Sequence, residues 1–506
     1  MFASALRKIY TTTWNGAKSY KVVDNKDKND PECYNERLTL FYKANRNINE
    51  KLDNMMHSSC EEHLIDTFLI SFNKRDCRGG SGERQVGRDM FVYLARNYPN
   101  HFIKVIHLIG DYGRFDDLLY LLPSISNTSK EVEESVLEYI KNTLESDKNK
   151  MNNGESTTIL AKWLPSENDS KDRKYKIVDT ICKYMKITPK QYRKDYITPL
   201  RAYLNIVECL MCSRRWEDID FNKVPSCAMH KLKYAFEKHT PESFRSWKDG
   251  LRNNETKVNA KQLFPHEIIK QINEVGHDDL LIAQWKVIEQ QIEEYGSFKD
   301  CLVVVDTSDS MRQDDSLPLH NACALGLLVS NFVKGDFHNL VITFNDIPEF
   351  VEIPDGNIVQ RFNHIKQISW GGSTNLQKTF EIILKRCIEH KVKQEDCPKK
   401  IIIISDMQFN TIEGYNQGQK TNLEDINEKY SKSGYTRPDI IFWNVASCYT
   451  DDFPVTTDDN GTCIISGFSP AIIKSLLTND KLSSVSIMNT NIHSERYNPI
   501  KEALES

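Results

Sequence analysis

The residues of this chain whose types and spacing are best suited to chemistry are an acid and two hydroxyls that follow an apolar stretch. Asp306, Ser308 and Ser310 stand at two-residue spacing directly after residues 301–305, a pattern that predicts a short buried strand. In α/β proteins, ligands bind beyond the carboxyl ends of such strands. Asp and Ser also gather in turns for local hydrogen-bonding reasons, so these three residues alone are a modest signal.

Two later segments carry residues of the same kind. Thr374 lies in the segment 369–375, which follows a short apolar stretch, and Asp406 comes after the strand-like run 401–404. The spacing between the three segments suits successive elements of one sheet, whose loops would meet at one edge. We therefore expect five residues to converge there: Asp306, Ser308, Ser310, Thr374 and Asp406.

Oxygen-bearing side chains of this kind suit a hard divalent cation, Mg²⁺ or else Mn²⁺ or Ca²⁺. Mg²⁺ takes about six oxygens, at distances near ~2.1 Å. The hydroxyls would bind the ion directly and the carboxylates would hold its waters. An ion with mostly neutral direct ligands stays electrophilic enough to accept a carboxylate or phosphate from a partner. The alternative is that Asp306, Ser308 and Ser310 only cap the helix that follows them.

The same loops favour docking over catalysis. A phosphotransferase of the haloacid dehalogenase type would need a second acid where Ser308 stands, and a P-loop would need Gly-Lys-Ser/Thr, which occurs nowhere in the sequence. No His or Lys lies in the three loops to act as a general base. We therefore expect a protein that is not an enzyme.

A second group of candidate residues is basic. Four arginines surround the glycines Gly79, Gly80 and Gly82: they are Arg75, Arg78, Arg84 and Arg88. Glycines let a backbone approach a phosphate closely, and guanidinium forks bind phosphate bidentately. An ordinary turn between helices with solvated charges would give the same pattern, so both interpretations stay open.

Residues 171–201 form a basic stretch with tyrosines interleaved. It holds ten Lys and Arg against three Asp, with Lys174, Arg193 and Lys194 among the bases. A basic stripe with aromatic side chains suits the phosphates and bases of a small structured or single-stranded RNA. The alternative is that these charges lie on the solvent-exposed face of two helices.

Composition bounds the rest. The chain has 506 residues and a formal net charge of −5, so we expect at least two domains and no bias toward a polyanionic partner. No apolar run approaches the ~18 residues of a membrane span, and the expected location is the cytoplasm, or the virion if the genome is viral. The thirteen cysteines show no disulfide framework, and we expect Cys209 and Cys212 to be buried free thiols.

The patterning predicts an α plus α/β protein. We expect residues 1–30 to form an extended arm and residues 31–296 to form amphipathic helices in consecutive short pairs, typical of a HEAT-like solenoid. From residue 297 to residue 506, strands and helices alternate. This alternation predicts a mostly parallel sheet covered on both faces.

The five converging residues resemble the metal-ion-dependent adhesion site of von Willebrand factor A-type domains. That family's pattern is D-x-S-x-S, then a Thr, then an Asp, and every position has a match here. The resemblance implies a Rossmann-like A-type domain over residues 297–506 and a protein ligand that supplies a carboxylate to the metal.

The pairing of a helical half with an A-type domain resembles the Ro autoantigen and telomerase/vault-associated family, and a family of unknown function resembles the chain over more of its length. The segments that carry the second resemblance are 15–17, 40–42, 75–84, 112–118, 161–166, 192–194, 225–226, 238–239, 264–266, 442–444 and 466–469. The first resemblance implies a helical ring that binds small RNAs and a non-enzymatic ribonucleoprotein scaffold. The alternative is an assembly protein, in a virion or the cytoplasm, whose two halves both bind proteins.

Overall fold

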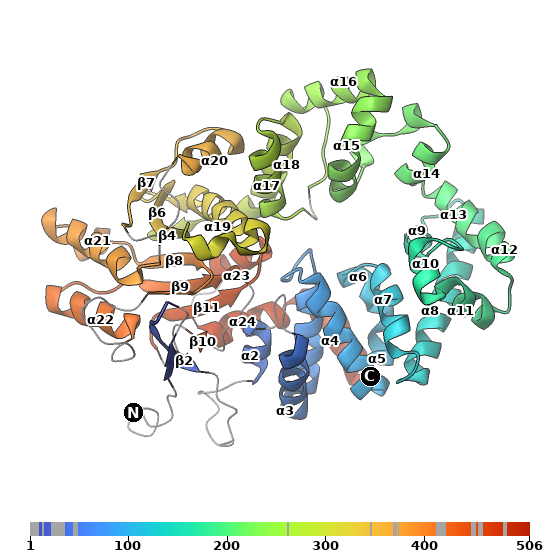
Figure 1. Cartoon of the computed structure of the whole chain (residues 1–506), viewed down its shortest axis with the longest axis horizontal. Coiled ribbons are helices and arrows are strands. Elements are labelled where there is room, and N and C mark those ends of the chain that lie inside the picture. The colour runs from blue at the N-terminus through green and yellow to red at the C-terminus, as the bar shows by residue number, and fades with distance from the viewer. Residues whose placement is uncertain are drawn as a thin grey trace. The chain divides into compact units, whose positions relative to one another are not determined.

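The structure of the chain is a computed structural model (Figure 1). It describes residues 10–12, 15–21, 36–43, 49–260, 263–344, 347–367, 372, 374–410, 421–446, 452–453, 459–478 and 483–506. The chain divides into two compact units. The α/β unit comprises Met1–Lys51 and Ala260–Asn491, and the helical unit comprises Leu52–Asn259 and Ile492–Ser506.

The α/β unit is built on a six-stranded sheet with the order β11-β9-β8-β4-β6-β7. Five strands are parallel, and β7 at the edge is antiparallel to β6. The strands are β4 (Cys301–Asp306), β6 (Leu340–Phe344), β7 (Phe350–Glu352), β8 (Lys400–Ser405), β9 (Asp439–Asn444) and β11 (Thr462–Ser466). The mostly parallel sheet that the alternating pattern predicts is therefore confirmed.

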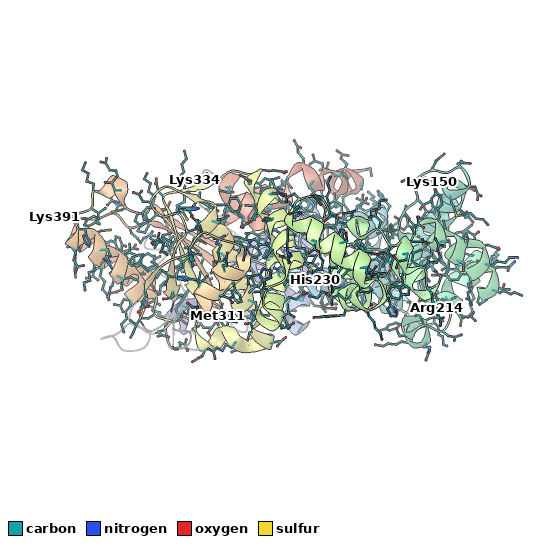
Figure 2. The ribbon with its side chains drawn as sticks, turned by 90° about the horizontal axis from the view of Figure 1, so that it is seen from above. Lys150, Arg214, His230, Met311, Lys334 and Lys391 are labelled. Atoms are coloured by element: carbon teal, nitrogen blue, oxygen red, sulfur yellow. The ribbon has the colours of Figure 1, made fainter. Side chains whose placement is uncertain are left out.

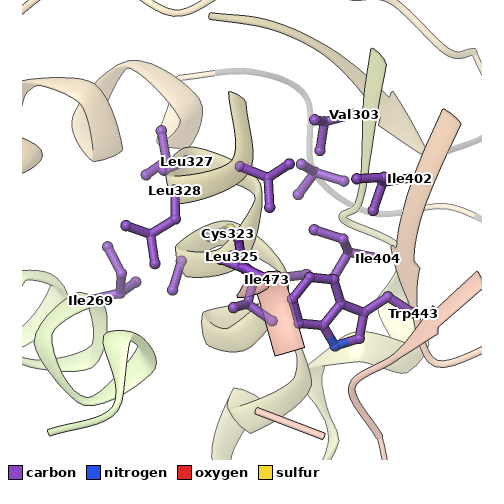
Figure 3. Packing of buried hydrophobic residues seen from close by; sticks show 14 of the residues in the cluster. Ile269, Val303, Cys323, Leu325, Leu327, Leu328, Ile402, Ile404, Trp443 and Ile473 are labelled. Carbon is purple, nitrogen blue, oxygen red and sulfur yellow. The ribbon is translucent and has the colours of Figure 1, made fainter. Parts of the chain in front are cut away.

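Helices cover both faces of this sheet because successive strand residues point to opposite sides. Val303 and Val305 lie in one apolar cluster, shown in part in Figure 3, and Leu302 and Val304 lie in a second cluster on the other face. The first cluster is covered by α17 (Pro265–Val275), α18 (Asp279–Glu293), α19 (Gln313–Asn331), α20 (Ile358–Lys366) and α23 (Ala471–Thr478). The second is covered by α21 (Leu376–Glu389) and α22 (Asn422–Ser433).

The described part of the N-terminal segment, predicted to be an extended arm, contains two strands that belong to the α/β unit. Strand β1 (Tyr10–Thr12) is antiparallel to β2 (Lys18–Lys21), which also pairs with β10 (Asp452–Phe453). Ala17 is 2% exposed and belongs to the second apolar cluster. The pairing of β2 with β1 and β10, together with the buried side chain of Ala17, therefore holds this segment on the α/β unit.

Helices α17 and α18 are helical as predicted, but they pack with the α/β unit. Ile268, Ile269, Trp285 and Ile288 are buried in the same apolar cluster as α19. The compact units thus separate at residues 259/260, whereas the change in sequence texture predicted a boundary at 296/297. A helical period shows which face of a helix is apolar and leaves open which neighbour covers that face.

The helical unit contains most of α3 (Asn49–Arg75) and the helices that follow it. These are α4 (Arg84–Asn97), α5 (Pro99–Val105), α6 (Ile109–Tyr112), α7 (Asp116–Ile125), α8 (Lys130–Asn152), α9 (Leu160–Trp163), α10 (Ser170–Tyr175), α11 (Ile177–Met185), α12 (Pro189–Tyr192), η2 (Arg193–Ile197, a π-helix), α13 (Thr198–Tyr203), α14 (Val207–Cys212), α15 (Ser226–His239) and α16 (Pro241–Arg252). The helical prediction is confirmed, and pairing as HEAT-type repeats stays a prediction.

Helix α8 illustrates why these segments are helical. Val132, Val136, Ile140 and Leu144 recur at four-residue spacing on one buried face. Acidic residues occupy its first turn, where they interact favourably with the helix dipole. The burial of this apolar stripe, more than intrinsic propensity, stabilises the helix.

The chain's last segment returns to the helical unit through η7 (Glu495–Tyr497) and α25 (Asn498–Glu505), and α25 packs on α5. Over the described residues, no helix combines the length and apolar character needed to cross a bilayer. Cys212 is exposed and Cys209 is half-buried, so neither thiol is buried as predicted. The helix α14 is short and turns its C-terminal end toward solvent.

Candidate functional site

The two acids of the predicted metal site end neighbouring parallel strands. Asp306 is the last residue of β4, and Asp406 follows the last residue of β8. From β4 the chain proceeds to β6 and β7 on one side, and then returns to β8, β9 and β11 on the other side. The gap between β4 and β8 is therefore the point where strand order reverses, which is where open α/β sheets bind ligands.

Hydrogen bonds join four of the five predicted residues. The backbone N–H of Ser308 donates to Asp306 Oδ1 at 2.9 Å, and the Ser308 and Ser310 hydroxyl oxygens lie 3.1 Å apart. Asp406 in turn shares a side-chain hydrogen bond with Ser310. Ser405, which sequence reasoning missed, donates its hydroxyl to Asp306 Oδ2. The two carboxylates and the two serine hydroxyls thus belong to one network.

The two acids of this network have raised pKa values. Burial raises the pKa of Asp306 to about 7, with the neighbouring charge of Asp406 as the next cause and hydrogen bonds from Ser308 and Ser405 acting in the opposite direction. Burial also raises the pKa of Asp406. No lysine, arginine or histidine in the described part of the chain forms an ion pair with either acid. Asp306 is fully buried and Asp406 is half-buried. A buried acid without a cationic partner is costly unless a proton or a metal ion neutralises it.

Thr374 lies on a loop that hydrogen bonds attach to both neighbouring loops. Its N–H donates to Asn410 Oδ1 at 3.2 Å, and the Asn410 N–H donates to the Thr374 carbonyl at 2.8 Å. On the other side, the Asp309 N–H donates to the Gly372 carbonyl at 3.2 Å. The Thr374 Oγ1 is buried and has no hydrogen-bond partner among the described residues. A buried hydroxyl without a partner fits a ligand atom that would complete it.

The donor set itself indicates which ion would fit. The described residues contain no group of three or more His, Cys, Asp and Glu side chains placed to hold a metal ion. A site here would therefore rely on the hydroxyls of Ser308, Ser310 and Thr374 together with the two acids. Such an all-oxygen set suits Mg²⁺, Mn²⁺ or Ca²⁺ and does not suit zinc, which prefers nitrogen and sulfur ligands. Met311, buried beside Ser310, is labelled in Figure 2.

The N-terminal segment supports the Asp406 loop, a relationship that sequence reasoning missed. Asn15 Nδ2 donates to the Gln408 carbonyl at 2.7 Å, and Gly16 forms an antiparallel bridge with Asn410. Lys18 bridges Thr421, which lies beyond residues 411–420, a stretch outside the described part of the chain. The available signal was the segment 15–17, which carries the family resemblance, but nothing local connects it to a loop almost 400 positions away.

The predicted phosphate-binding arginines are largely engaged inside the helical unit. Arg75 is 2% exposed, and its Nε lies 2.7 Å from Asp117 Oδ2. Arg88 contacts Asp117 at 2.5 Å and Asp116 at 3.0 Å, and Arg84 contacts Asp116 at 2.6 Å. The charges of Arg75 and Arg88 are therefore neutralised by buried acids, and their guanidiniums hold α3 and α4 to α7. Arg75 and Arg88 therefore form ion pairs between helices in this structure.

The glycines of the same segment have a packing role. A side chain on Gly80 would collide with the Asn73 carbonyl oxygen, and one on Gly87 would collide with the backbone of Arg75. Arg78 is exposed, and its Nη1 donates to the Asp111 carbonyl at 2.5 Å. Close approach of the chain to itself accounts for Gly80 and Gly87.

The second basic group remains on the surface. Lys174, Arg193 and Lys194 are all exposed, and Tyr175 is 43% exposed with the Lys174 ammonium 4.8 Å from its ring centre. Tyr192, by contrast, is buried and donates its hydroxyl to the Pro165 carbonyl. The exposed bases of this stripe are Arg173, Lys174, Lys176, Lys183, Lys186, Lys190, Arg193 and Lys194.

Comparison with known proteins gives matches along most of the chain. Residues 126–298 match the family described as "Domain of unknown function (DUF2828)", and residues 300–504 match "Domain of unknown function (DUF7788)". The chain is 30% identical over 451 residues to "Uncharacterized protein L728" of Acanthamoeba polyphaga mimivirus, an alignment that covers 83% of this chain and 77% of that protein. The chain therefore belongs to the family of this mimivirus protein.

Among solved structures, the Ro (RSR) protein of Deinococcus radiodurans is similar to 91% of this chain and to 100% of its own length, at 11% identity and a TM-score of 0.40. At that score the two chains are not shown to share a fold.

The two family matches meet at residues 298–300, close to the boundary expected from sequence texture.

Proposed function

We propose that the α/β unit is a von Willebrand factor A-type domain that docks a partner through a divalent cation. Ser308, Ser310 and Thr374 would bind Mg²⁺ through their hydroxyls, and Asp306 and Asp406 would hold its waters. A carboxylate or phosphate of the partner would complete the shell. The observation that carries the proposal is the hydrogen-bonded group of the buried Asp306, the half-buried Asp406, Ser308 and Ser310, in which no described cation pairs with either acid. A second supporting observation is the buried Thr374 Oγ1, which has no hydrogen-bond partner among the described residues.

The site would bind and not catalyse. A docking role follows from the ligand types, because neutral hydroxyls leave the ion able to attract an anionic group from outside. The three loops carry no His or Lys that could move a proton. When bound, the ion would attach an anionic group of the partner. The chain's own residues would hold the ion in place.

We further propose that the helical unit binds RNA, so that the whole chain is a ribonucleoprotein scaffold of the cytoplasm or of a viral particle. The support comes from the exposed bases around Lys174, Arg193 and Lys194, and from Tyr175, whose half-exposed ring could stack on a base. Arg75, Arg84 and Arg88 are not part of this proposal, because Asp116 and Asp117 pair with them.

The second candidate function is an assembly protein that binds proteins with both units. It is favoured by the ion pairs of Arg75 and Arg88, whose guanidiniums are largely covered and engaged with Asp117, so that these two arginines are not available to a phosphate backbone. The two candidates differ in whether nucleic acid copurifies. A preparation with the absorbance ratio of pure protein, and no salt-dependent shift with RNA, would favour the assembly protein.

The metal proposal is tested on the full chain by titrating Mg²⁺ and Mn²⁺ into the wild type and into the double variant Asp306→Ala with Ser308→Ala. We expect the double variant to lose at least a hundredfold in affinity while its circular dichroism spectrum is unchanged. The matched control is Asp315→Asn, an exposed acid of the following helix that pairs with Lys270. Equal metal affinity in wild type and double variant would reject the site.

A further inference from the structure

Two cysteines at the other end of the sheet lie close enough to react with each other. Cys387 is in the last turn of α21, and Cys397 lies just before β8, ten positions later. Their sulfur atoms are 3.5 Å apart. A disulfide requires about 2.05 Å, so the two side chains would have to approach by only ~1.5 Å in total.

The segment between the two cysteines is held in a fixed conformation. The Val392 N–H donates to the Cys387 carbonyl at 2.9 Å, and the Tyr435 hydroxyl lies 2.9 Å from the carbonyl oxygens of both Cys387 and Val392. The Cys397 Sγ also lies 3.4 Å from the Lys393 carbonyl. The proximity of the sulfur atoms therefore rests on a hydrogen-bonded turn, with little chain entropy left to lose when they join.

A pocket gives small molecules access to both sulfur-bearing side chains. It has a volume of about 260 Å³, and both cysteines line it together with Phe337, Phe350 and Arg386. Cys387 is 7% exposed and Cys397 is 5% exposed, so each side chain is largely covered but not sealed. The pocket offers a small disulfide a route to the pair.

We propose that Cys387 and Cys397 form a reversible dithiol–disulfide site whose oxidant is a low-molecular-weight disulfide. One cysteine thiolate attacks a sulfur of the small disulfide, which gives a mixed disulfide and releases one small thiolate. The second cysteine then attacks the sulfur of the first, which closes the Cys387–Cys397 bond and releases the second small thiolate. The two released thiolates take up the two protons lost by the cysteines, so the small disulfide is reduced to two thiols.

Burial raises the pKa of Cys387 to about 12, and the neighbouring Cys397 thiol adds to the shift. Since the thiolate is the nucleophile, this thiol should react slowly at neutral pH.

The test uses the full chain equilibrated with hydroxyethyl disulfide and mercaptoethanol at a series of ratios, followed by alkylation, digestion and mass spectrometry. We expect Cys387 and Cys397 to lose their thiols together, in one two-electron transition, and to appear as a crosslinked peptide pair two hydrogens lighter than the reduced pair. Cys323, buried on α19, should stay reduced.

Single variants check the assignment. Cys387→Ser and Cys397→Ser should each abolish the crosslink, because each removes one of the two sulfur atoms. Cys323→Ser should crosslink as the wild type does. The proposal is overturned if the wild type shows no crosslink between Cys387 and Cys397 at any ratio, a result that does not depend on whether a variant folds. It is also overturned if another cysteine pair crosslinks first.

Discussion

Arg496 and Asp76 form an ion pair within the helical unit although 420 positions separate them in the sequence. The Arg496 Nη2 donates to Asp76 Oδ1 at 2.8 Å, and its Nε contacts the second oxygen of the same carboxylate. The Tyr497 hydroxyl donates to Asp76 at 3.1 Å, and the Tyr497 ring stacks on Tyr112 with centres 5.5 Å apart. The last residues of the chain thus complete a unit that begins more than 400 residues earlier.

Removing this pair should destabilise the helical unit. Arg496→Ala leaves the fully buried Asp76 carboxylate without its cation, which costs about 3 kcal/mol of unfolding free energy. Urea unfolding followed by circular dichroism measures the change. Arg215→Ala is the control, since Arg215 makes an exposed pair with Asp218 that should contribute less than about 1 kcal/mol. Similar losses in the two variants would show that residues 492–506 are not integral to the unit.

Magnesium affinity should depend on pH in a defined direction. The pKa of Asp306 is raised to about 7, so below that pH a proton occupies the carboxylate that would otherwise hold the ion's waters. We expect the affinity for Mg²⁺ to be steady above pH 8 and to fall by up to about tenfold per pH unit below pH 7. Isothermal titration calorimetry from pH 5.5 to 8.5 measures it. An affinity independent of pH over that range would contradict the assignment of Asp306 to the ion.

Without metal, Asp306→Asn should stabilise the protein at pH 8. A carboxyl whose pKa is raised on folding binds more protons in the folded state than in the unfolded state, so its contribution to stability falls as pH rises from about 4 to about 7. The uncharged amide of the Asp306→Asn variant does not titrate, so this pH-dependent loss of stability is absent. Saturating Mg²⁺ should reverse the ranking, because at a hundred times the dissociation constant the ion adds about 2.7 kcal/mol to the wild type only. Thermal melts of both proteins with and without Mg²⁺ measure these differences in stability. The control Asp315→Asn should have the stability of the wild type in both conditions.

Asn410 should act on the ion through Thr374. Asn410→Ala removes the acceptor of the Thr374 N–H and should weaken Mg²⁺ binding by about tenfold, the equivalent of one net hydrogen bond. Asn410→Asp keeps an acceptor oxygen and should restore most of the affinity, which a loss of folding stability alone would not do. Asn427→Ala, an exposed asparagine of α22, is the control. Equal affinities in all four proteins would separate Asn410 from the site.

If the exposed basic stripe binds RNA, its charges should set the salt dependence. Each phosphate of a single strand that is neutralised contributes about −0.7 to the log–log slope of affinity against salt. Replacing Lys174, Arg193 and Lys194 with Ala should therefore flatten the slope by up to about 2 units. The matched control replaces three exposed lysines elsewhere in the helical unit, Lys223, Lys231 and Lys238. Fluorescence anisotropy with a labelled oligonucleotide measures both, and indistinguishable slopes would reject RNA binding by the stripe.

The sequence by itself determined the elements and the meeting point of the two acids. The apolar run before Asp306 and the run before Asp406 each predict a buried strand from residues next to one another, and parallel strands bring their carboxyl ends to one edge. The spacing of apolar residues is a local property of the sequence, so it predicts strands and helices without knowledge of the fold. The helices of the first half followed from the same kind of pattern, as α8 shows.

Only the tertiary structure decided which charges and hydroxyls are free. Arg75 and Arg88 look like phosphate ligands until Asp117, 42 and 29 positions away, pairs with them. Asn15 meets Gln408 across 393 positions, and Arg496 meets Asp76 across 420. These pairings depend on which surfaces pack together, and the free energy that selects them comes from burial over the whole chain, so no local spacing encodes them.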